Sequence, residues 1–99
     1  MKEKNIGKKV IIRAQGAGVF FGTLVARDGQ EVELKDVRRI WRWEGAASLS
    51  QLATEGTSNP SGCRFTVIVP SMEVLGVIEV IPCTDQAIES IEGVPTWRA

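Results

Sequence analysis

The chain has 99 residues, of which 43% are hydrophobic and 24% charged, and its 12 Lys and Arg balance its 12 Asp and Glu. This length and composition predict one soluble globular domain over residues 1–99, a size that often gains stability by associating with copies of itself. The sequence contains no histidine, which excludes Ser-His-Asp and Cys-His catalytic pairs. Its two cysteines lack metal-ligand spacing, so we expect neither an enzyme nor a cofactor or metal site.

The location and the charge distribution also follow from the sequence. No apolar run is long enough to cross a bilayer, and no apolar segment follows the charged N-terminus, so we expect a cytoplasmic protein. Residues 1–43 hold ten Lys and Arg against five Asp and Glu, whereas residues 44–99 hold two against seven. Such asymmetry indicates either an anionic ligand for the basic half or mutual neutralisation, within the fold or across a homo-oligomer interface.

The first half of the chain alternates strand-like runs with tight turns. Lys8 to Arg13 and Val19 to Ala26 are rich in β-branched and aromatic residues and predict two strands. Gly22, inside the second run, predicts a bulge or a sharp bend. The segment from Arg27 to Gln30 contains an Asp-Gly hairpin signal, and the alternating run Glu31 to Lys35 follows as a third strand, with its valine and leucine pointing inward.

The second half mixes helical and strand patterns. Small and apolar residues recur at helical spacing after Glu44, and apolar runs return beyond residue 62. Trp97 in the C-terminal tail is expected to dock on the domain or on a neighbouring subunit. The expected elements are a helix from Ala46 to Glu55 ended by Gly56, strands from Cys63 to Val69 and from Val74 to Ile81 with a turn at Pro70-Ser71, and a helix from Gln86 to Glu92 introduced by Thr84.

The run Val37 to Trp43 (VRRIWRW) concentrates three guanidiniums and two indoles in seven residues. As a strand it places Arg38 and Arg42 on one face and Arg39 on the other, because successive side chains alternate. A strand with a guanidinium on each face is hard to bury on either side, so we expect it at an edge of the sheet or at a site. The alternative is a surface strand with solvated arginines and with tryptophans that fill the core.

Arginine forks pair with phosphate oxygens, aromatic faces stack on bases, and a helix N-terminus presents free N–H groups to an anion. The arginines and tryptophans of this run, followed by the hydroxyls that begin the predicted helix, therefore indicate a nucleotide-type ligand. One of the two serines is also expected to cap the helix. The candidate ligand-binding residues are Arg38, Arg39, Trp41, Arg42, Trp43, Ser48 and Ser50.

Two resemblances bear on the fold and the setting. The segment Gly18 to Leu24, the Asp28-Gly29 turn and Val32 to Leu34 resemble the strand pairs of Sm-like proteins. The expected fold class is therefore mainly β with one or two short helices (α+β), a small, strongly bent antiparallel sheet of the SH3-like or Sm-like barrel type. The strings VIIRAQGAGVFFGTL, RRIWRWEGAASLSQLA and EVIPCT resemble a family of short proteins of unknown function encoded by bacteriophages and prophages.

That phage resemblance implies a protein that inhibits host defence. We therefore expect a homo-oligomeric binding protein that sequesters a nucleotide signal of bacterial immunity, either a cyclic nucleotide or an ADP-ribose derivative. Two alternatives use the same residues: a nucleic-acid-binding module, and an inhibitor that blocks a host protein directly. The near-zero net charge disfavours the nucleic-acid alternative, because extended phosphate backbones prefer a continuous basic surface.

Overall fold

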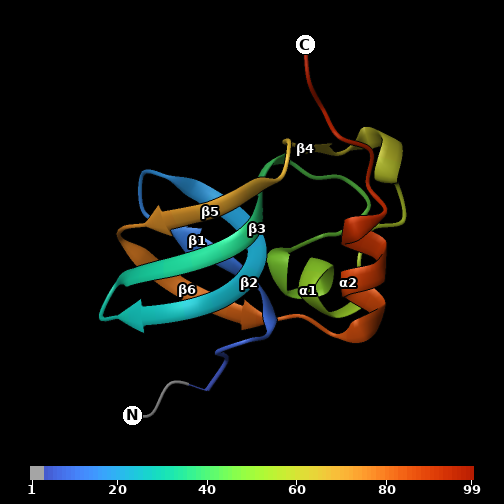
Figure 1. Cartoon of the computed structure of the whole chain (residues 1–99). Coiled ribbons are helices and arrows are strands. Elements are labelled where there is room, and N and C mark those ends of the chain that lie inside the picture. The colour runs from blue at the N-terminus through green and yellow to red at the C-terminus, as the bar shows by residue number, and fades with distance from the viewer. Residues whose placement is uncertain (1–3) are drawn as a thin grey trace.

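The computed structural model describes residues 4–99, so Met1–Glu3 of the charged N-terminus lie outside the described residues. A bent sheet lies on one side of the molecule and two helices lie on the other (Figure 1). The prediction of a mainly β domain with one or two short helices is confirmed, and the α-helices are two. The elements are β1 (Lys9–Ala14), β2 (Gly18–Asp28), β3 (Glu31–Arg42), α1 (Leu49–Glu55), the 3₁₀ helix η1 (Pro60–Gly62), β4 (Arg64–Phe65), β5 (Val69–Val74), β6 (Val77–Pro82) and α2 (Asp85–Glu92).

All strand pairs of the sheet are antiparallel. The strand order is β4-β3-β2-β1-β6. β5 lies on the same side of β3 as β4: β4 pairs with the end of β3, and β5 pairs with residues 32–37 of β3. The predicted bend at Gly22 is confirmed: Asp36 and Val37 of β3 together oppose Gly22 of β2, so the register shifts there. A Cβ on this glycine would lie 3.1 Å from the carbonyl oxygen of Lys35, so the close approach of β2 and β3 depends on its absence.

The sheet separates two hydrophobic cores, which is why apolar residues fill both faces of its central strands. In β1, Val10 and Ile12 face a core enclosed by the bent sheet, together with Val32 and Leu34 as predicted. Ile11, between them in sequence, faces the opposite way into a core under the helices. The same alternation sends adjacent phenylalanines of β2 into different cores.

Three expectations about strands are corrected by the structure. β3 is a single strand inside the sheet, with β2 on one side and β4 and β5 on the other, so of the two alternatives for Val37 to Trp43, an edge or a site, the edge is wrong. It continues through Asp36, whose φ of 52° marks the bulge. β5 runs through Pro70 and Ser71, where a turn was expected. An edge strand accepts a proline at a position where its missing N–H removes no ladder hydrogen bond. The turn comes instead at Leu75 and Gly76, between β5 and β6. The expected strand from Cys63 to Val69 is interrupted, because Arg64–Phe65 pairs with β3 and the next residue to do so is Val69, where β5 begins.

The two helices pack against each other and contribute Leu52, Ala53, Ala87 and Ile91 to the second core. α1 is shorter than predicted and begins only at Leu49. α2 follows the prediction closely, from its Thr84 cap to Gly93. No helix in residues 4–99 has the length and apolar character needed to span a membrane.

Candidate functional site

The candidate site lies where β3, β4 and the C-terminal segment meet. Pairing of β3 with β4 sets Arg42 opposite Arg64. The segment after α2 then runs parallel to β4, and the backbone N–H of Trp97 donates to the carbonyl of Phe65 at 2.9 Å. Trp41 is the outward-facing residue of β3 beside this segment, and the centroids of its ring and the Trp97 ring are 5.0 Å apart, stacked at an interplanar angle of 29°.

The guanidinium of Arg64 lies over both tryptophans, with its central carbon 5.6 Å from the centroid of Trp41 and 5.3 Å from that of Trp97. Both rings remain accessible, since Trp41 is 56% exposed and Trp97 is 40% exposed. We call Trp41, Arg64 and Trp97 the Trp–Arg platform. A platform of this kind offers flat π surface and positive charge together, which is the chemistry that nucleic-acid-binding proteins use to hold bases and phosphates.

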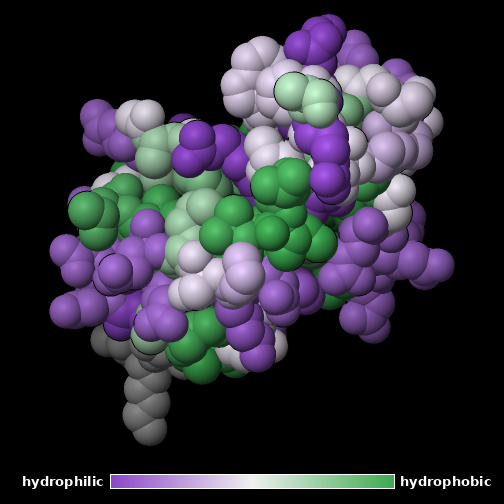
Figure 2. Space-filling view, turned by 45° about the horizontal axis from the view of Figure 1, so that its top comes forward, coloured by the Kyte–Doolittle hydropathy of each residue, from purple (hydrophilic) through white to green (hydrophobic). Residues whose placement is uncertain are grey.

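A cavity of about 400 Å³ adjoins the Trp–Arg platform and shares Trp97 with it. This volume falls in the range of small-molecule sites, and its apolar wall with one cationic side chain fits a planar anionic ligand. Figure 2 turns this side of the molecule forward and shows hydrophobic surface gathered between hydrophilic groups. The cavity is lined by Thr66, Val67, Trp97, Arg98 and Ala99.

Arg38 was predicted to bind ligand phosphate, and the structure gives it a different role. It is only 3% exposed, and its guanidinium donates hydrogen bonds to four backbone carbonyls. Burial away from water lowers the pKa of this guanidinium. Arg38 therefore ties β4 to the end of α2 and to the C-terminal segment that carries Trp97. The acceptors are Thr66 at 3.2 Å, Ile91 at 3.1 Å, and Phe65 and Pro95 at 3.4 Å each.

The other two arginines of β3 are exposed, as a ligand site requires. The guanidinium carbon of Arg39 lies 4.8 Å from the centroid of Phe20 and covers the ring. Arg42 is paired with Glu44, with 3.4 Å between Nη2 and Oε1, and both side chains are half exposed. Because such surface pairs contribute little energy, Arg42 can exchange this carboxylate for a phosphate at small cost.

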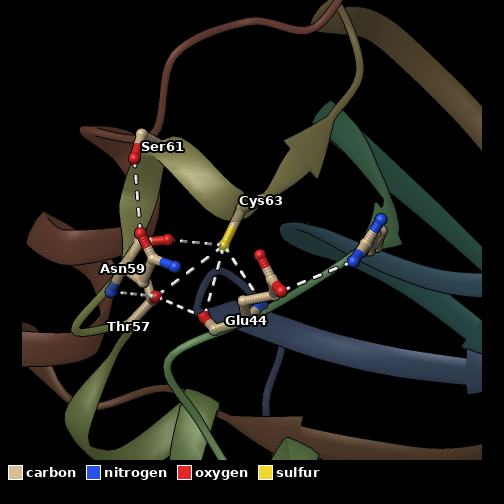
Figure 3. A network of polar contacts seen from close by, with 6 residues as sticks. Glu44, Thr57, Asn59, Ser61 and Cys63 are labelled. Atoms are coloured by element: carbon tan, nitrogen blue, oxygen red, sulfur yellow. Dashed lines mark hydrogen bonds and ion pairs between the residues drawn. The ribbon is translucent and has the colours of Figure 1, made fainter.

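A network of polar contacts fixes the chain that leads away from β3 (Figure 3). Thr57 donates its hydroxyl hydrogen bond to the carbonyl of Glu44 at 2.5 Å. The sulfur of Cys63 lies 3.5 Å from the backbone nitrogen and carbonyl oxygen of Glu44, and also 3.5 Å from the carbonyl of Asn59. These contacts join the segment after β3 to the loop before β4. Glu44 in turn pairs with Arg42, whose register partner on β4 is Arg64.

Three further predicted site residues do not join the Trp–Arg platform. Trp43 is partly buried and packs against the core under the helices, which agrees with the core alternative for this ring. Ser48 caps α1, because its hydroxyl oxygen accepts the N–H of Gln51 at 3.1 Å. The amide oxygen of Gln51 in turn accepts the N–H of Ala47, so these two donors at the start of the helix are already paired. Ser50 is exposed within α1.

Sequence reasoning missed two contributors to the site. Arg64 and Arg98 are isolated cations in an acidic half of the chain, and only the pairing of β4 with β3 brings Arg64 beside Trp41. Trp97 was predicted to dock on the domain or on a neighbouring subunit; it docks on the domain, against Trp41, a partner that could not be named from sequence.

The two cysteines differ in burial, since Cys63 is buried and Cys83 is partly buried. Cys63 and Cys83 are both free thiols. Burial raises the pKa of Cys83 to about 11, against a smaller lowering by a hydrogen bond to the backbone of Ile11, so this thiol stays neutral near pH 7. Within residues 4–99, no group of three or more His, Cys, Asp or Glu is placed to hold a metal ion.

Comparison with known proteins supports the fold. A family described as a domain of unknown function, DUF6948, matches residues 7–91. A heptameric archaeal Sm protein has a similar structure, with a TM-score of 0.52 and 19% sequence identity over 81% of this chain and 91% of that chain. The expected Sm-like fold is therefore confirmed. No curated protein matches the chain significantly in sequence.

Proposed function

We propose that this chain, which belongs to the DUF6948 family, a domain of unknown function, is a homo-oligomeric protein that binds a nucleotide-type ligand. The observation that carries this proposal is a guanidinium lying over two exposed indoles at the edge of a cavity of about 400 Å³. A base stacks on the exposed indole surface, and the phosphates face Arg64 and Arg98.

The energetics of the site favour a nucleotide over a purely apolar ligand. Base stacking on an aromatic side chain contributes roughly 1–3 kcal/mol. A hydrogen bond from arginine to a phosphate oxygen contributes roughly 1.5–3 kcal/mol, and each arginine fork can make two such bonds. Arg42 is paired in register with Arg64 across β3 and β4, and it can add a third arginine because its surface ion pair with Glu44 is weak. Four exposed arginines, Arg39, Arg42, Arg64 and Arg98, lie on β3, β4 and the C-terminal segment that form this end of the molecule.

The biological role that we propose is sequestration. The sequence resembles short proteins encoded by bacteriophages, and a phage protein that removes a nucleotide signal of bacterial immunity needs affinity for the signal and no catalytic group. A cyclic nucleotide or an ADP-ribose derivative has the base, the ribose and the phosphates that the Trp–Arg platform and its cavity fit.

Replacing Trp41 by alanine should weaken nucleotide binding by roughly 5- to 150-fold, which corresponds to the loss of one base stack. Replacing Arg64 by alanine should weaken it at least as much, because the cation over both rings is lost. Isothermal titration calorimetry with cyclic dinucleotides, cyclic trinucleotides and ADP-ribose measures both effects.

The matched control is Arg13→Ala, since Arg13 is also an exposed arginine and pairs with Glu79 across β1 and β6. It should bind like the unmodified protein. Absence of heat with every nucleotide, or equal losses in the Arg13 and Arg64 variants, would contradict the proposal.

A single-stranded nucleic acid is the second candidate, because the Trp–Arg platform is open and the four exposed arginines extend beyond its cavity. The two candidates differ in their dependence on ligand length and salt. A nucleic-acid site binds oligonucleotides more tightly than mononucleotides, and its affinity falls steeply with ionic strength. Equal affinity for a dinucleotide and a long oligonucleotide favours the small-molecule site.

Homo-oligomerisation is proposed from the edges of the sheet. In the described part of the chain, β5 pairs only with β3 and β6 only with β1, so each has one unpaired side. Leu75, in the turn between them, is 60% exposed, and Ile78 on β6 is 49% exposed. Unpaired edges with exposed apolar side chains are templates for strand pairing between chains. The similar archaeal Sm protein is itself heptameric.

The second prediction follows from these edges. Introducing lysine at Ile78 should convert an assembled protein into a smaller species, because a charge on an edge strand opposes pairing. Light scattering coupled to size-exclusion chromatography measures the mass. Lysine at Val25, which is 38% exposed on the interior strand β2, is the control and should leave the mass unchanged. A monomeric parent protein, or equal assembly of both variants, would contradict this proposal.

A further inference from the structure

A second cavity, of about 290 Å³, shares no lining residue with the Trp–Arg platform or its cavity. Its walls come from the first three strands, from the segment that precedes β5 and from the end of α2. The segment Thr66–Ile68 separates the two cavities, because Thr66 and Val67 line the first and Ile68 lines the second. The second cavity is lined by Lys9, Phe21, Asp36, Arg38, Ile68 and Glu92.

The lining combines two cations with two carboxylates. Nζ of Lys9 lies 3.5 Å from Oε2 of Glu92, an ion pair with the lysine side chain 25% and the glutamate side chain 51% exposed. Arg38 donates four hydrogen bonds to backbone carbonyls, one from Nε, one from Nη1 and two from Nη2. A guanidinium has five N–H donors, so one N–H of Nη1 is left for another acceptor.

Asp36 is the carboxylate without a partner. Its side chain makes no hydrogen bond or ion pair with the described part of the chain. It is also the single non-glycine residue in residues 4–99 with a positive φ, 52°, at the bulge opposite Gly22. The bulge adds one residue to β3 and so fixes where this carboxylate leaves the strand.

The apolar part of the cavity lies beside these charges. The ring of Phe21 is buried, and Nζ of Lys9 lies over it at 5.6 Å from the centroid. Ile68 is 59% exposed, so it offers an apolar surface that no described residue covers. A ligand here meets cations, carboxylates and a hydrophobic wall within one small volume.

We propose that this second cavity binds a small zwitterion of the α-amino-acid class, an activity separate from the nucleotide binding proposed above. The ligand carboxylate accepts from Lys9 and from the remaining N–H of Arg38. The ligand ammonium group donates to Asp36 and Glu92, and an apolar side chain packs on Phe21 and Ile68.

The balance of charge selects this ligand class. A simple anion would be attracted by the two cations, Lys9 and Arg38, but repelled by the two carboxylates. A simple cation would be attracted by the carboxylates, Asp36 and Glu92, but repelled by the two cations. A zwitterion satisfies both pairs at once. The volume also excludes large ligands, because it lies at the lower limit of small-molecule sites.

The test is a titration of the full chain, labelled with ¹⁵N, with each of the common amino acids, followed by nuclear magnetic resonance. Binding of at least one amino acid should shift the backbone signals of Lys9, Asp36 and Ile68. For leucine as the probe, 4-methylpentanoate lacks the ammonium group and isoamylamine lacks the carboxylate. Each of these analogues should bind at least roughly tenfold more weakly, since each loses one set of charge-assisted bonds.

The informative variant is Asp36→Asn, because asparagine accepts a positive φ as readily as aspartate and removes only the charge. It should weaken amino-acid binding roughly tenfold or more with an unchanged melting temperature, whereas Glu79→Gln on β6 should change neither. Trp41→Ala should leave amino-acid binding intact, which separates this site from the nucleotide site. The proposal is overturned if no amino acid shifts the cavity signals, if the two leucine analogues bind as well as leucine, or if Asp36→Asn binds normally.

Discussion

Replacing Arg38 by methionine should lower the free energy of unfolding by about 2–5 kcal/mol. Methionine keeps much of the side-chain volume but leaves four backbone carbonyls without their donor. Two of these bonds, to Ile91 and to Phe65, are buried, and a buried acceptor without a partner costs roughly 1–3 kcal/mol. The C-terminal segment with Trp97 should loosen as a consequence, because Arg38 also bonds to Pro95.

Urea unfolding followed by circular dichroism measures this loss. Arg39→Met is the matched control, because Arg39 is exposed, and its loss should stay within about 0.5 kcal/mol. Arg38→Lys should fall between the two, since lysine keeps the charge but not the planar fork of donors. Equal stability of the Arg38 and Arg39 methionine variants would show that the four carbonyl contacts do not hold the fold.

Replacing Phe65 by alanine should cost about 3–5 kcal/mol, the usual loss for a large aromatic side chain in a core. Phe65 is fully buried in the core under the helices, and the guanidinium of Arg38 lies over its ring at 5.3 Å. Its strand is only two residues long, so side-chain packing rather than ladder hydrogen bonds holds β4 against β3. The variant should therefore detach β4 from Ile40 as well as lose stability.

Thermal and urea unfolding of Phe65→Ala and Val67→Ala measure this effect side by side. Val67 is 43% exposed two residues further on, so its truncation should change the stability by no more than about 0.5 kcal/mol. A loss below about 1 kcal/mol for Phe65→Ala would mean that β4 contributes little to the second core.

Local patterns were sufficient to predict most strands and both helices. Alternation around Val32 and Leu34, the Asp-Gly turn and the Thr84 cap depend on residues close in sequence, and each was predicted correctly. The interior position of β3 was not predicted. The strands on its second side, β4 and β5, come more than twenty residues later in the sequence, so a strand with arginines on both faces was taken for an edge strand.

The site, too, was predicted only where it depends on residues close together in the sequence. The composition of Val37–Trp43 indicated an exposed site, and Trp41 and Arg42 are indeed exposed. The burial of Arg38 could not be predicted, because its partners are backbone carbonyls from three distant segments. Every residue has a backbone carbonyl, so the sequence does not indicate which of them accept from Arg38. Arg64 reaches Trp41 only through strand pairing.

We claim that an exposed pair of indoles under Arg64 holds a nucleotide base, and the indole N–H signals of the three tryptophans test this most directly. Titration of the ¹⁵N-labelled protein with a cyclic dinucleotide or with ADP-ribose should shift the Trp41 and Trp97 signals and leave that of Trp43, which packs in the core, unchanged. Saturating nucleotide that moves none of the three signals, or moves only that of Trp43, would contradict the claim.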